Sequence, residues 1–442
     1  MNLLEAYKNK LAVADSFYGK MHSGAKMDQQ KKLITAMCLN NISKFLGESF
    51  APTAATQRTG MGDFKKFCLN LTTVAVPNLI AHDLVIVSPM SSYSGYVTYI
   101  EYQAGTTKGA TKTGDLLNNP FKLGDVDQTY TSSRVVESFT ATANQTEFTV
   151  AWTPVLDTKD ATGKYNAVKV LVDGTEVTVA SVDAETGKIT LSAAATEGKE
   201  VRIAYVYDNV VIPQNNLPTI RAEIKSIPLV AEARRIAVYY SQIAAYQASV
   251  DYGTNLPDQL AQKAVGQLAY EIDTEVTQLL IDNAKEDAEL VWSKKVPNAV
   301  SKAEHYEGFA EMVEIGRQKI YDATKRFAPN YMLIASNVLP VLTFIKGFTA
   351  APAGQVNGPY FAGTLNGLKV FVTPNITPGK YVIGVNGEDL MSSAAVYAPY
   401  MAIVPTAALG TPDGANAQGF STMYALKMLN PDLLVAGKVT ND

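Results

Sequence analysis

The feature that most constrains the fold is a β-rich run between Thr131 and Ile212. Within it, Asp173-Gly174 separates two segments rich in valine, and this dipeptide in such a setting is typical of a two-residue hairpin turn. Short strands at this spacing predict a small, Ig-like β-sandwich of about 80 residues. The segments expected to be strands are Glu147–Trp152, Val168–Val172, Thr175–Val179, Gly187–Leu191 and Val201–Tyr207.

Charge also separates this run from the rest of the chain. It holds 7 of the 38 basic and 11 of the 42 acidic residues, so the entire net charge of −4 falls within it. We therefore expect a solvated unit of its own within a chain whose 442 residues exceed what one hydrophobic core serves. A chain without excess basic charge is not expected to grip nucleic-acid phosphates.

Helical spacing of apolar residues dominates on both sides of the run. Residues 1 to about 50 are predicted to be helical, with a further helical piece from Asp63 to Val74. After the run, Ile236 to Val250 shows helical spacing, which favours buried packing of Tyr239, Tyr240 and Tyr246 over a platform for stacking bases.

A long one-sided helix is predicted to follow. It starts near Pro257, which suits a first helical turn, and carries an apolar stripe as far as Leu280. Glu271, Asp273 and Glu275 lie off this stripe and are expected to form a solvated face. A helix over Glu307–Lys325 and short strands beyond it complete an α+β chain. The expected strands are Tyr331–Ser336, Leu368–Thr373, Lys380–Gly384 and Tyr397–Val404.

The residue types that carry chemistry are sparse. His82-Asp83 is reminiscent of the paired metal ligands of phosphohydrolases, but no further ligand motif accompanies it, so we expect these two side chains to orient a turn by hydrogen bonding. No nucleophile elbow, phosphate loop or zinc spacing occurs. We expect no catalytic site, metal or cofactor. Cys38 and Cys68 are interpreted as free thiols of a reducing cytoplasm rather than a disulfide.

One run resembles a family signature. Pro77 to Gly95 reads Pro-Asn-Leu-Ile-Ala-His-Asp, then an apolar strand, Pro-Met and a small-residue loop, and is similar to a run in major capsid proteins of contractile-tailed bacteriophages. Four further blocks resemble that family in the same order along the chain: Arg221 to Ile243, Gln259 to Leu280, Asn330 to Val338, and Tyr397 to Pro405 with Gly419, Tyr424 and Asn430-Pro431.

The resemblance implies the HK97-type capsid fold, interrupted here by an inserted all-β domain. The expected parts are an N-terminal arm (1–80), an extended loop with its flanks (81–130 and 213–235), the inserted β-sandwich (131–212), a peripheral domain with a spine helix (236–330), and an axial domain with the return to the peripheral domain (331–442). The side chains expected at joints and subunit interfaces are Pro77, His82, Asp83, Pro89, Met90, Tyr93, Gly95, Arg221, Arg234 and Arg235.

The function implied by the resemblance is that of a shell protein. Copies would assemble as hexamers and pentamers into an icosahedral head around double-stranded DNA, without sequence-specific binding, together with scaffold, portal and decoration proteins. Assembly would take place in the bacterial host cytoplasm, and no membrane is expected because no apolar run is long enough to span one. Two alternatives remain open: a module whose β-sandwich binds a host glycan or a decoration protein, and a hydrolase that uses His82 and Asp83.

Overall fold

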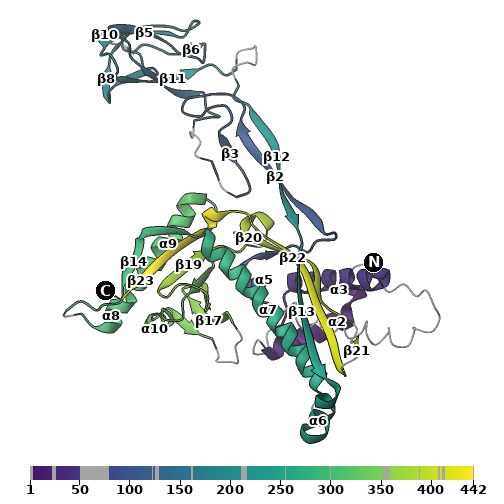
Figure 1. The fold of residues 1–442 in the computed structure, drawn as a ribbon. Coiled ribbons are helices and arrows are strands. Elements are labelled where there is room, and N and C mark those ends of the chain that lie inside the picture. Colours follow the sequence, from purple (N-terminus) through teal and green to yellow (C-terminus); the bar gives the residue numbers. More distant parts are fainter. Residues whose placement is uncertain are drawn as a thin grey trace. The chain divides into compact units, whose positions relative to one another are not determined.

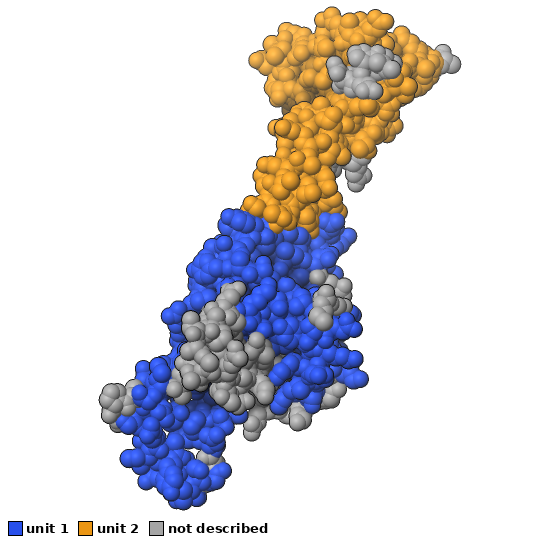
Figure 2. All heavy atoms as spheres, turned by 90° about the vertical axis from the view of Figure 1, so that its right-hand side faces the viewer, with its two compact units in different colours: residues 1–97, 227–442 blue, residues 98–226 orange. Residues whose placement is uncertain are grey.

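The computed structural model divides the chain into two compact units, coloured blue and orange in Figure 2. Unit 1 comprises Met1–Val97 and Ile227–Asp442, and unit 2 comprises Thr98–Ser226. Pro77, Cys68 and the helical piece predicted over Asp63–Val74 lie outside the described residues. The structure describes residues 3–21, 26–49, 79–121, 123–124, 129–160, 163–210, 217–253, 255–298, 300–351, 358–387, 389–406, 409–410 and 414–441.

The N-terminal helices are confirmed. They are α1 (Leu3–Ala6), α2 (Lys8–Met21) and α3 (Gln29–Ser49), and α3 buries Ile34, Cys38 and Ile42 at helical spacing. Cys38 is a free thiol, and burial raises its pKa to about 12, so it stays protonated and unreactive at neutral pH.

The long helix is also confirmed as α7 (Leu256–Asn283), with a proline in its first turn. Its buried stripe steps along the helix every four residues through Ala264, Leu268, Ile272, Val276 and Leu280. The first half of the stripe packs with Ile403 and Phe420 of the neighbouring sheet, which fixes the helix against that sheet (Figure 1).

That sheet has the order β1-β20-β22-β13, with β21 also paired to β22. Its strands are β1 (Ile86–Val87), β13 (Glu232–Ser241), β20 (Ala395–Pro405), β21 (Leu409–Gly410) and β22 (Ala415–Met428). The helix predicted from Ile236 is wrong in its first half, because β13 runs antiparallel to β22 as far as Ser241. Helix α6 (Gln242–Tyr252) begins only there. The predicted burial of the tyrosines is wrong as well: Tyr239 and Tyr246 are exposed and Tyr240 is half-buried.

A second sheet of seven strands holds the main core of unit 1. Its order is β14-β23-β19-β15-β18-β17-β16, and the buried rings of Phe309, Tyr331, Phe371 and Tyr381 pack in the core around it. The strands predicted in the last third of the chain are confirmed. The strands are β14 (Lys285–Ser293), β15 (Tyr331–Ile334), β16 (Phe348–Ala350), β17 (Tyr360–Leu365), β18 (Leu368–Val372), β19 (Lys380–Gly384) and β23 (Leu434–Thr440); the helices are α8 (Lys302–Glu307), α9 (Phe309–Thr324), α10 (Leu339–Leu342) and the 3-10 turns η3 (Leu390–Ser392) and η4 (Pro431–Leu433).

Unit 2 is built from strands. One sheet has the order β12-β2-β3, with β2 (Ser94–Ala104), β3 (Leu116–Asn118) and β12 (Ile220–Val230). Strands β2 and β12 each cross the boundary to unit 1, and they carry the chain out of that unit and back. The remaining strands are β4 (Arg134–Thr140), β5 (Gln145–Thr149), β6 (Val155–Leu156), β7 (Lys169–Val172), β8 (Thr175–Val177), β9 (Val179–Asp183), β10 (Lys188–Ala195) and β11 (Glu200–Tyr207).

These later strands form two sheets, β4-β11-β7-β8 with β6, and β5-β10-β9, which share one apolar core. Phe148 and Ile189 enter the core from one sheet, and Val170 and Ile203 from the other. The predicted hairpin is confirmed: Asp173 and Gly174 join β7 to β8 with φ of 49° and 80°. Positive φ at both central positions is the geometry that favours Asp-Gly in a two-residue turn.

Lys108 lies at the base of this two-sheet core. Its side chain is almost fully buried, and its ammonium group donates to the carbonyl oxygens of Tyr130, at 2.9 Å, and Ser132. The same group lies 5.5 Å from the ring centroid of Trp152 and 5.0 Å from that of Tyr207. One cation therefore holds the segment after β2 against the aromatic residues of the two-sheet core.

Mixed α+β structure, as predicted, describes the chain as a whole.

Candidate functional site

The signature run is organised around a single helical turn, α5 (Ala81–Leu84). Ala81 and Leu84 are fully buried and anchor the turn in the main core of unit 1. The backbone N–H of Ala81 donates to the Oδ1 atom of Asp273 on α7 at 3.0 Å. The first N–H groups of a helix have no partner within it, so this carboxyl supplies the missing acceptor.

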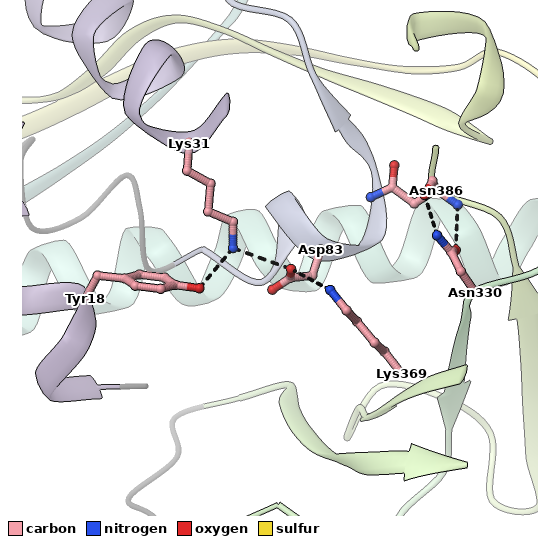
Figure 3. Close-up of polar contacts among 6 residues, drawn as sticks. All are labelled: Tyr18, Lys31, Asp83, Asn330, Lys369 and Asn386. Carbon is pink, nitrogen blue, oxygen red and sulfur yellow. Dashed lines mark hydrogen bonds and ion pairs between the residues drawn. The ribbon is translucent and has the colours of Figure 1, made fainter. Parts of the chain in front are cut away.

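Asp83 joins the same turn to two other elements (Figure 3). Its Oδ1 atom lies 3.4 Å from the ammonium nitrogen of Lys31 on α3 and 3.4 Å from that of Lys369 on β18. The Lys31 ammonium also donates to the hydroxyl of Tyr18 on α2 at 3.2 Å. A single carboxylate thus ties two N-terminal helices, the turn and a strand of the seven-stranded sheet into one network.

The two aspartates have opposite electrostatic environments. Burial raises the pKa of Asp273 to about 7, against the backbone N–H groups of Ala81 and Ile80, which lower it. Burial also acts to raise the pKa of Asp83, but the positive charges of Lys31 and Lys369 outweigh it and leave the pKa below its ordinary value. Asp83 is therefore an ionised ion-pair partner at neutral pH, whereas Asp273 keeps its proton to a much higher pH than an ordinary aspartate.

A polar cleft of about 280 Å³ opens beside Asp83. His82, Lys26, Lys31 and Asn386 contribute to its wall. The backbone N–H of Asn386 donates to the Oδ1 atom of Asn330 at 2.9 Å, and the Asn330 amide donates back to the Asn386 carbonyl (Figure 3). These contacts join the residue before β15 to the segment after β19, two paired strands of the seven-stranded sheet.

Beyond the turn, the run becomes an edge strand. β1 pairs in parallel with β20, and the backbone N–H of Met90 donates to the carbonyl of Pro399 at 3.0 Å. Met90 is buried, and its own carbonyl accepts from the side chain of Asn41 at 2.8 Å. Pro89 is half-buried. Tyr93 and Gly95 lie at the start of β2, where Tyr93 is exposed and its carbonyl accepts from the backbone N–H of Ala231 at 3.0 Å.

The three arginines singled out in the sequence lie in different surroundings. Arg234, on β13, binds the carboxylate of Glu275 at 2.7 Å and that of Glu271 at 3.3 Å. The hydroxyl of Tyr424 also donates to Glu275. Arg235 is exposed on β13, and Arg221 is exposed on β12.

The solvated face predicted for Glu271, Asp273 and Glu275 is therefore wrong. Asp273 is buried, and the two glutamates accept from Arg234. The sequence shows that Glu271 and Glu275 lie four residues apart, on one side of a helix. It does not show that Arg234 on β13 binds both glutamates, or that the N–H of Ala81 on α5 donates to Asp273. Of the residues predicted from the signature run, the structure places His82 and Asp83 at the cleft. No sequence signal marked Lys31 and Lys369 as partners of Asp83, or Asp273 as the acceptor for the N–H of Ala81.

Among the residues that the structure describes, no three His, Cys, Asp or Glu side chains are grouped so as to hold a metal ion. No described helix combines the length and apolar character needed to cross a bilayer.

Comparison with known proteins identifies the kind of protein. The family model for the major capsid protein Gp23 matches residues 61–441 of this chain. The signature turn, α7 and the strands of unit 1 all lie within this match. The match assigns the chain to the structural proteins that build phage heads, as the resemblance in the sequence predicted. This chain belongs to the Gp23 family of major capsid proteins.

Individual relatives agree with the family match. The major capsid protein of Enterobacteria phage T4 is 25% identical over 398 residues, covering 81% of this chain and 73% of the relative. That of Enterobacteria phage T6 is 24% identical over 398 residues, covering 81% and 76%. A solved structure of the capsid of Myoviridae phage XM1 is 8% identical and covers 52% of this chain and 81% of its own, with a TM-score of 0.36. The family assignment rests on the sequence matches.

Proposed function

We propose that this major capsid protein assembles with itself into hexamers and pentamers, which close into an icosahedral head around double-stranded genomic DNA. The observation that carries the proposal is the family match over residues 61–441. The net charge of −4 is compatible with a wall that encloses DNA without sequence-specific contacts. Copies would assemble in the host cytoplasm with scaffold, portal and decoration proteins and reside in the virion, and the chain would act as a building block rather than an enzyme.

We assign unit 1 the parts of the HK97-type fold: an N-terminal arm up to residue 80, a spine helix in α7, and an axial domain built on the seven-stranded sheet. The extended loop would be the ribbon formed by β2 and β12. Nearly every residue of β12 is exposed or half-buried, and Ile224 has 74% of its surface in solvent. An 11-residue strand with exposed apolar side chains along one face, at Ile220, Ile224 and Val230, is typical of a segment that is covered by another chain.

The exposed interface candidates fit this role. Arg221 lies on the ribbon, Tyr93 immediately precedes it, and Arg235 lies on β13, so each is available to a neighbouring copy. Pro77, His82, Asp83, Pro89, Met90, Gly95 and Arg234 would instead act within the chain by setting the position of the ribbon.

The inserted domain would be an Ig-like sandwich that spans residues 131–212 and stabilises capsomers or is displayed on the outside of the head. The two sheets and single core of β4 to β11 support this proposal. So does the acidic excess of residues 131–212, because a solvated exterior position tolerates uncompensated charge.

Electron microscopy tests the assembly proposal. We expect closed shells, or hexameric and pentameric capsomers, when the purified or co-expressed protein is imaged. A monodisperse monomer at high concentration under every scaffolded condition would contradict it.

A deletion tests the inserted domain. We expect a chain that lacks residues 131–212, with its flanks joined by a short Gly-Ser link, to retain a folded unit 1, because the removed residues carry their own core. The complete loss of soluble folded protein in this deletion would show that the domain is not an independent insertion.

A further inference from the structure

The polar cleft beside α5 holds an excess of positive charge. The charged side chains among its described lining residues are Lys26, Lys31, Lys369, Asp28 and Asp83. With His82 neutral, three ammonium groups among these residues are set against two carboxylate groups, so one positive charge is left over. The cleft volume of about 280 Å³ lies near the lower end of the range for small-molecule sites. Charge and size together fit a small anion.

Asp83 is a distant partner for the two lysines beside it. Hydrogen bonds between an ammonium group and a carboxylate are usually about 2.7–2.9 Å long. Here Lys31 and Lys369 both approach the same Oδ1 atom of Asp83, each at 3.4 Å. Only 15% of the Lys31 side chain is exposed, so bulk water is a poor substitute for a closer acceptor. An ammonium group has three donors, and an anion in the cleft can therefore bind both lysines without displacing Asp83.

A buried acceptor in the wall of the cleft narrows the class of anion. The Oδ1 atom of Asn386 is buried and has no hydrogen-bond partner among the residues that the structure describes. The backbone groups of Asn386 bind Asn330, and its side chain points away from Asn330 (Figure 3). A buried acceptor without a donor is unfavourable. A ligand with an O–H group would supply that donor.

A phosphate group meets both requirements. Its charged oxygens accept strong hydrogen bonds from ammonium groups. Inorganic phosphate at neutral pH also keeps an O–H group, and so does a phosphate monoester in its singly charged form. Sulfate and acetate carry no such donor at this pH. The leftover charge of the cleft and the acceptor of Asn386 therefore favour a protonated phosphate group over these anions.

We propose that the cleft binds a protonated phosphate group, whose charged oxygens accept from Lys31 and Lys369 and whose O–H group donates to the Oδ1 atom of Asn386. The bound group would join α3, β18 and the segment after β19 beside the turn of the signature run. Inorganic phosphate and small phosphate monoesters share this chemistry. A shell can be built without this ligand, so the site is independent of the proposed function.

Equilibrium dialysis measures the binding directly. The full-length protein is dialysed against ³²P-labelled phosphate at pH 6 and constant ionic strength, with unlabelled competitors. We expect one bound phosphate per chain and at least roughly tenfold weaker competition by sulfate, which cannot donate to Asn386. Stronger competition by glycerol 1-phosphate than by unlabelled phosphate would identify a monoester as the preferred ligand, weaker competition would identify the inorganic ion, and both results support the site. The absence of saturable binding, or sulfate that competes as well as phosphate, would overturn the proposal.

Two variants and a matched control test the assigned side chains. Lys369→Met should weaken phosphate binding roughly tenfold, because it removes one charged donor. The control is Lys32→Met, which removes the same charge from α3 outside the cleft, where Lys32 binds Asp15 at 3.1 Å, and it should leave the affinity unchanged. Asn386→Leu should abolish the preference for phosphate over sulfate, a readout that a merely structural role would not change. Wild-type affinity in Lys369→Met, or an unchanged preference in Asn386→Leu, would contradict the assignment.

Unfolding of the wild-type site gives a measurement that does not depend on these variants. A ligand that binds only the folded state raises the unfolding midpoint by mass action. Trp292 lies in unit 1 with the cleft and Trp152 in unit 2, so the two units are followed separately by fluorescence in Trp152→Phe and Trp292→Phe backgrounds. We expect phosphate to raise the urea midpoint of unit 1 above its value in sulfate of equal ionic strength, and to leave unit 2 the same in both salts. Equal midpoints of unit 1 in the two salts would overturn the proposal and leave the shell function untouched.

Discussion

Asp273, in the middle of α7, accepts a hydrogen bond of 3.0 Å from the backbone N–H of Ala81, which lies 192 residues earlier in the chain. A carboxyl buried in a helix is costly unless it is hydrogen-bonded, and here the first turn of α5 supplies the donors. The long helix therefore sets the position of the turn from which β1 and then β2 begin.

The pKa of about 7 makes the contact dependent on pH. Between the ordinary value of 3.8 and about 7, the folded chain keeps a proton on Asp273 that the unfolded chain has lost. The contribution of this group to the free energy of unfolding is therefore largest below 3.8, declines as the pH rises to about 7, and is constant above that. We expect Asp273→Asn to remove this decline and to be at least as stable as the wild type at pH 8.

Asp273→Ala is the matched comparison, because it removes the acceptor as well as the charge. It leaves the N–H of Ala81 buried without its partner, and we expect it to lower the free energy of unfolding by about 1–3 kcal/mol at pH 5 and by less at pH 8, where the wild type has itself lost the contribution of the protonated carboxyl. Urea unfolding at the two pH values measures both variants. An asparagine variant that loses as much as the alanine variant would show that the hydrogen bond is not what stabilises the turn.

The two tryptophans allow each unit to be followed by itself. Trp292 is buried in unit 1 and Trp152 in unit 2. Fluorescence in a Trp152→Phe background therefore reports the unfolding of unit 1, and a Trp292→Phe background reports unit 2. Each variant is compared with the wild type in the same background.

The two lysines on Asp83 are expected to contribute unequally. The side chain of Lys31 is 15% exposed and also binds Tyr18, whereas that of Lys369 is 54% exposed. We expect Lys31→Met to destabilise unit 1 by about 1 kcal/mol and Lys369→Met by a few tenths at most. Because the pKa of Asp83 is lowered, its stabilising effect is present above 3.8 and is lost as the pH falls through its folded value, so the cost of Lys31→Met should shrink in acid. Equal costs for the two variants would contradict this ranking.

Lys108 should matter to unit 2 far more than its neighbour Lys112. Lys108→Met leaves the carbonyl of Tyr130 without its donor and removes the cation from the rings of Trp152 and Tyr207. We expect a loss of about 1–3 kcal/mol in the unfolding of unit 2, measured by Trp152 fluorescence. Lys112 is exposed, so Lys112→Met should stay within about 0.5 kcal/mol of the wild type. A similar small effect at both positions would exclude a structural role for the Lys108 cation.

Replacement of Gly174 and of Gly266 by alanine should change stability in opposite directions, because the two glycines differ in backbone conformation. A Cβ atom at Gly174 or Gly266 would meet no atom within 4 Å, so packing is not a factor at either. Gly174 has a φ of 80°, and Gly174→Ala should destabilise unit 2 by about 1–2 kcal/mol. Gly266 is an exposed position of α7, and Gly266→Ala should stabilise unit 1 by about 0.5–1 kcal/mol. Thermal melts in the two tryptophan backgrounds measure both, and a stabilising Gly174→Ala would disprove the assigned turn.

Local signals explain what the sequence could predict about the fold. The Asp173-Gly174 turn and the stripe of α7 depend on neighbours within a few residues, and both were predictable. Ile236 to Ser241 were misassigned because Ile236, Tyr239 and Tyr240 also fit helical spacing. These residues form a strand because they pair with β22, about 180 residues later, and no local sequence pattern indicates that partner.

The candidate site shows the same division. The sequence predicted a turn at His82-Asp83, and α5 confirms it. It could not identify Lys31 or Lys369 as partners of Asp83, because they lie 52 residues before and 286 residues after it. The exposure of Tyr246 on α6 was missed for a related reason: periodicity shows that apolar residues share one side of a helix, but not whether that side faces the core or the solvent.

The paired strands β2 and β12 have a consequence for how such a protein changes over evolutionary time. Gly105 and Thr219 are joined by a backbone hydrogen bond of 2.7 Å, so the intervening 113 residues leave and return at one point. The loop-closure entropy that unit 1 has to overcome is then nearly independent of what is spliced between those strands, because the hydrogen-bonded ribbon already holds the two ends together. Related proteins could therefore gain, lose or exchange the residues between these strands during evolution while the fold of unit 1 stays the same.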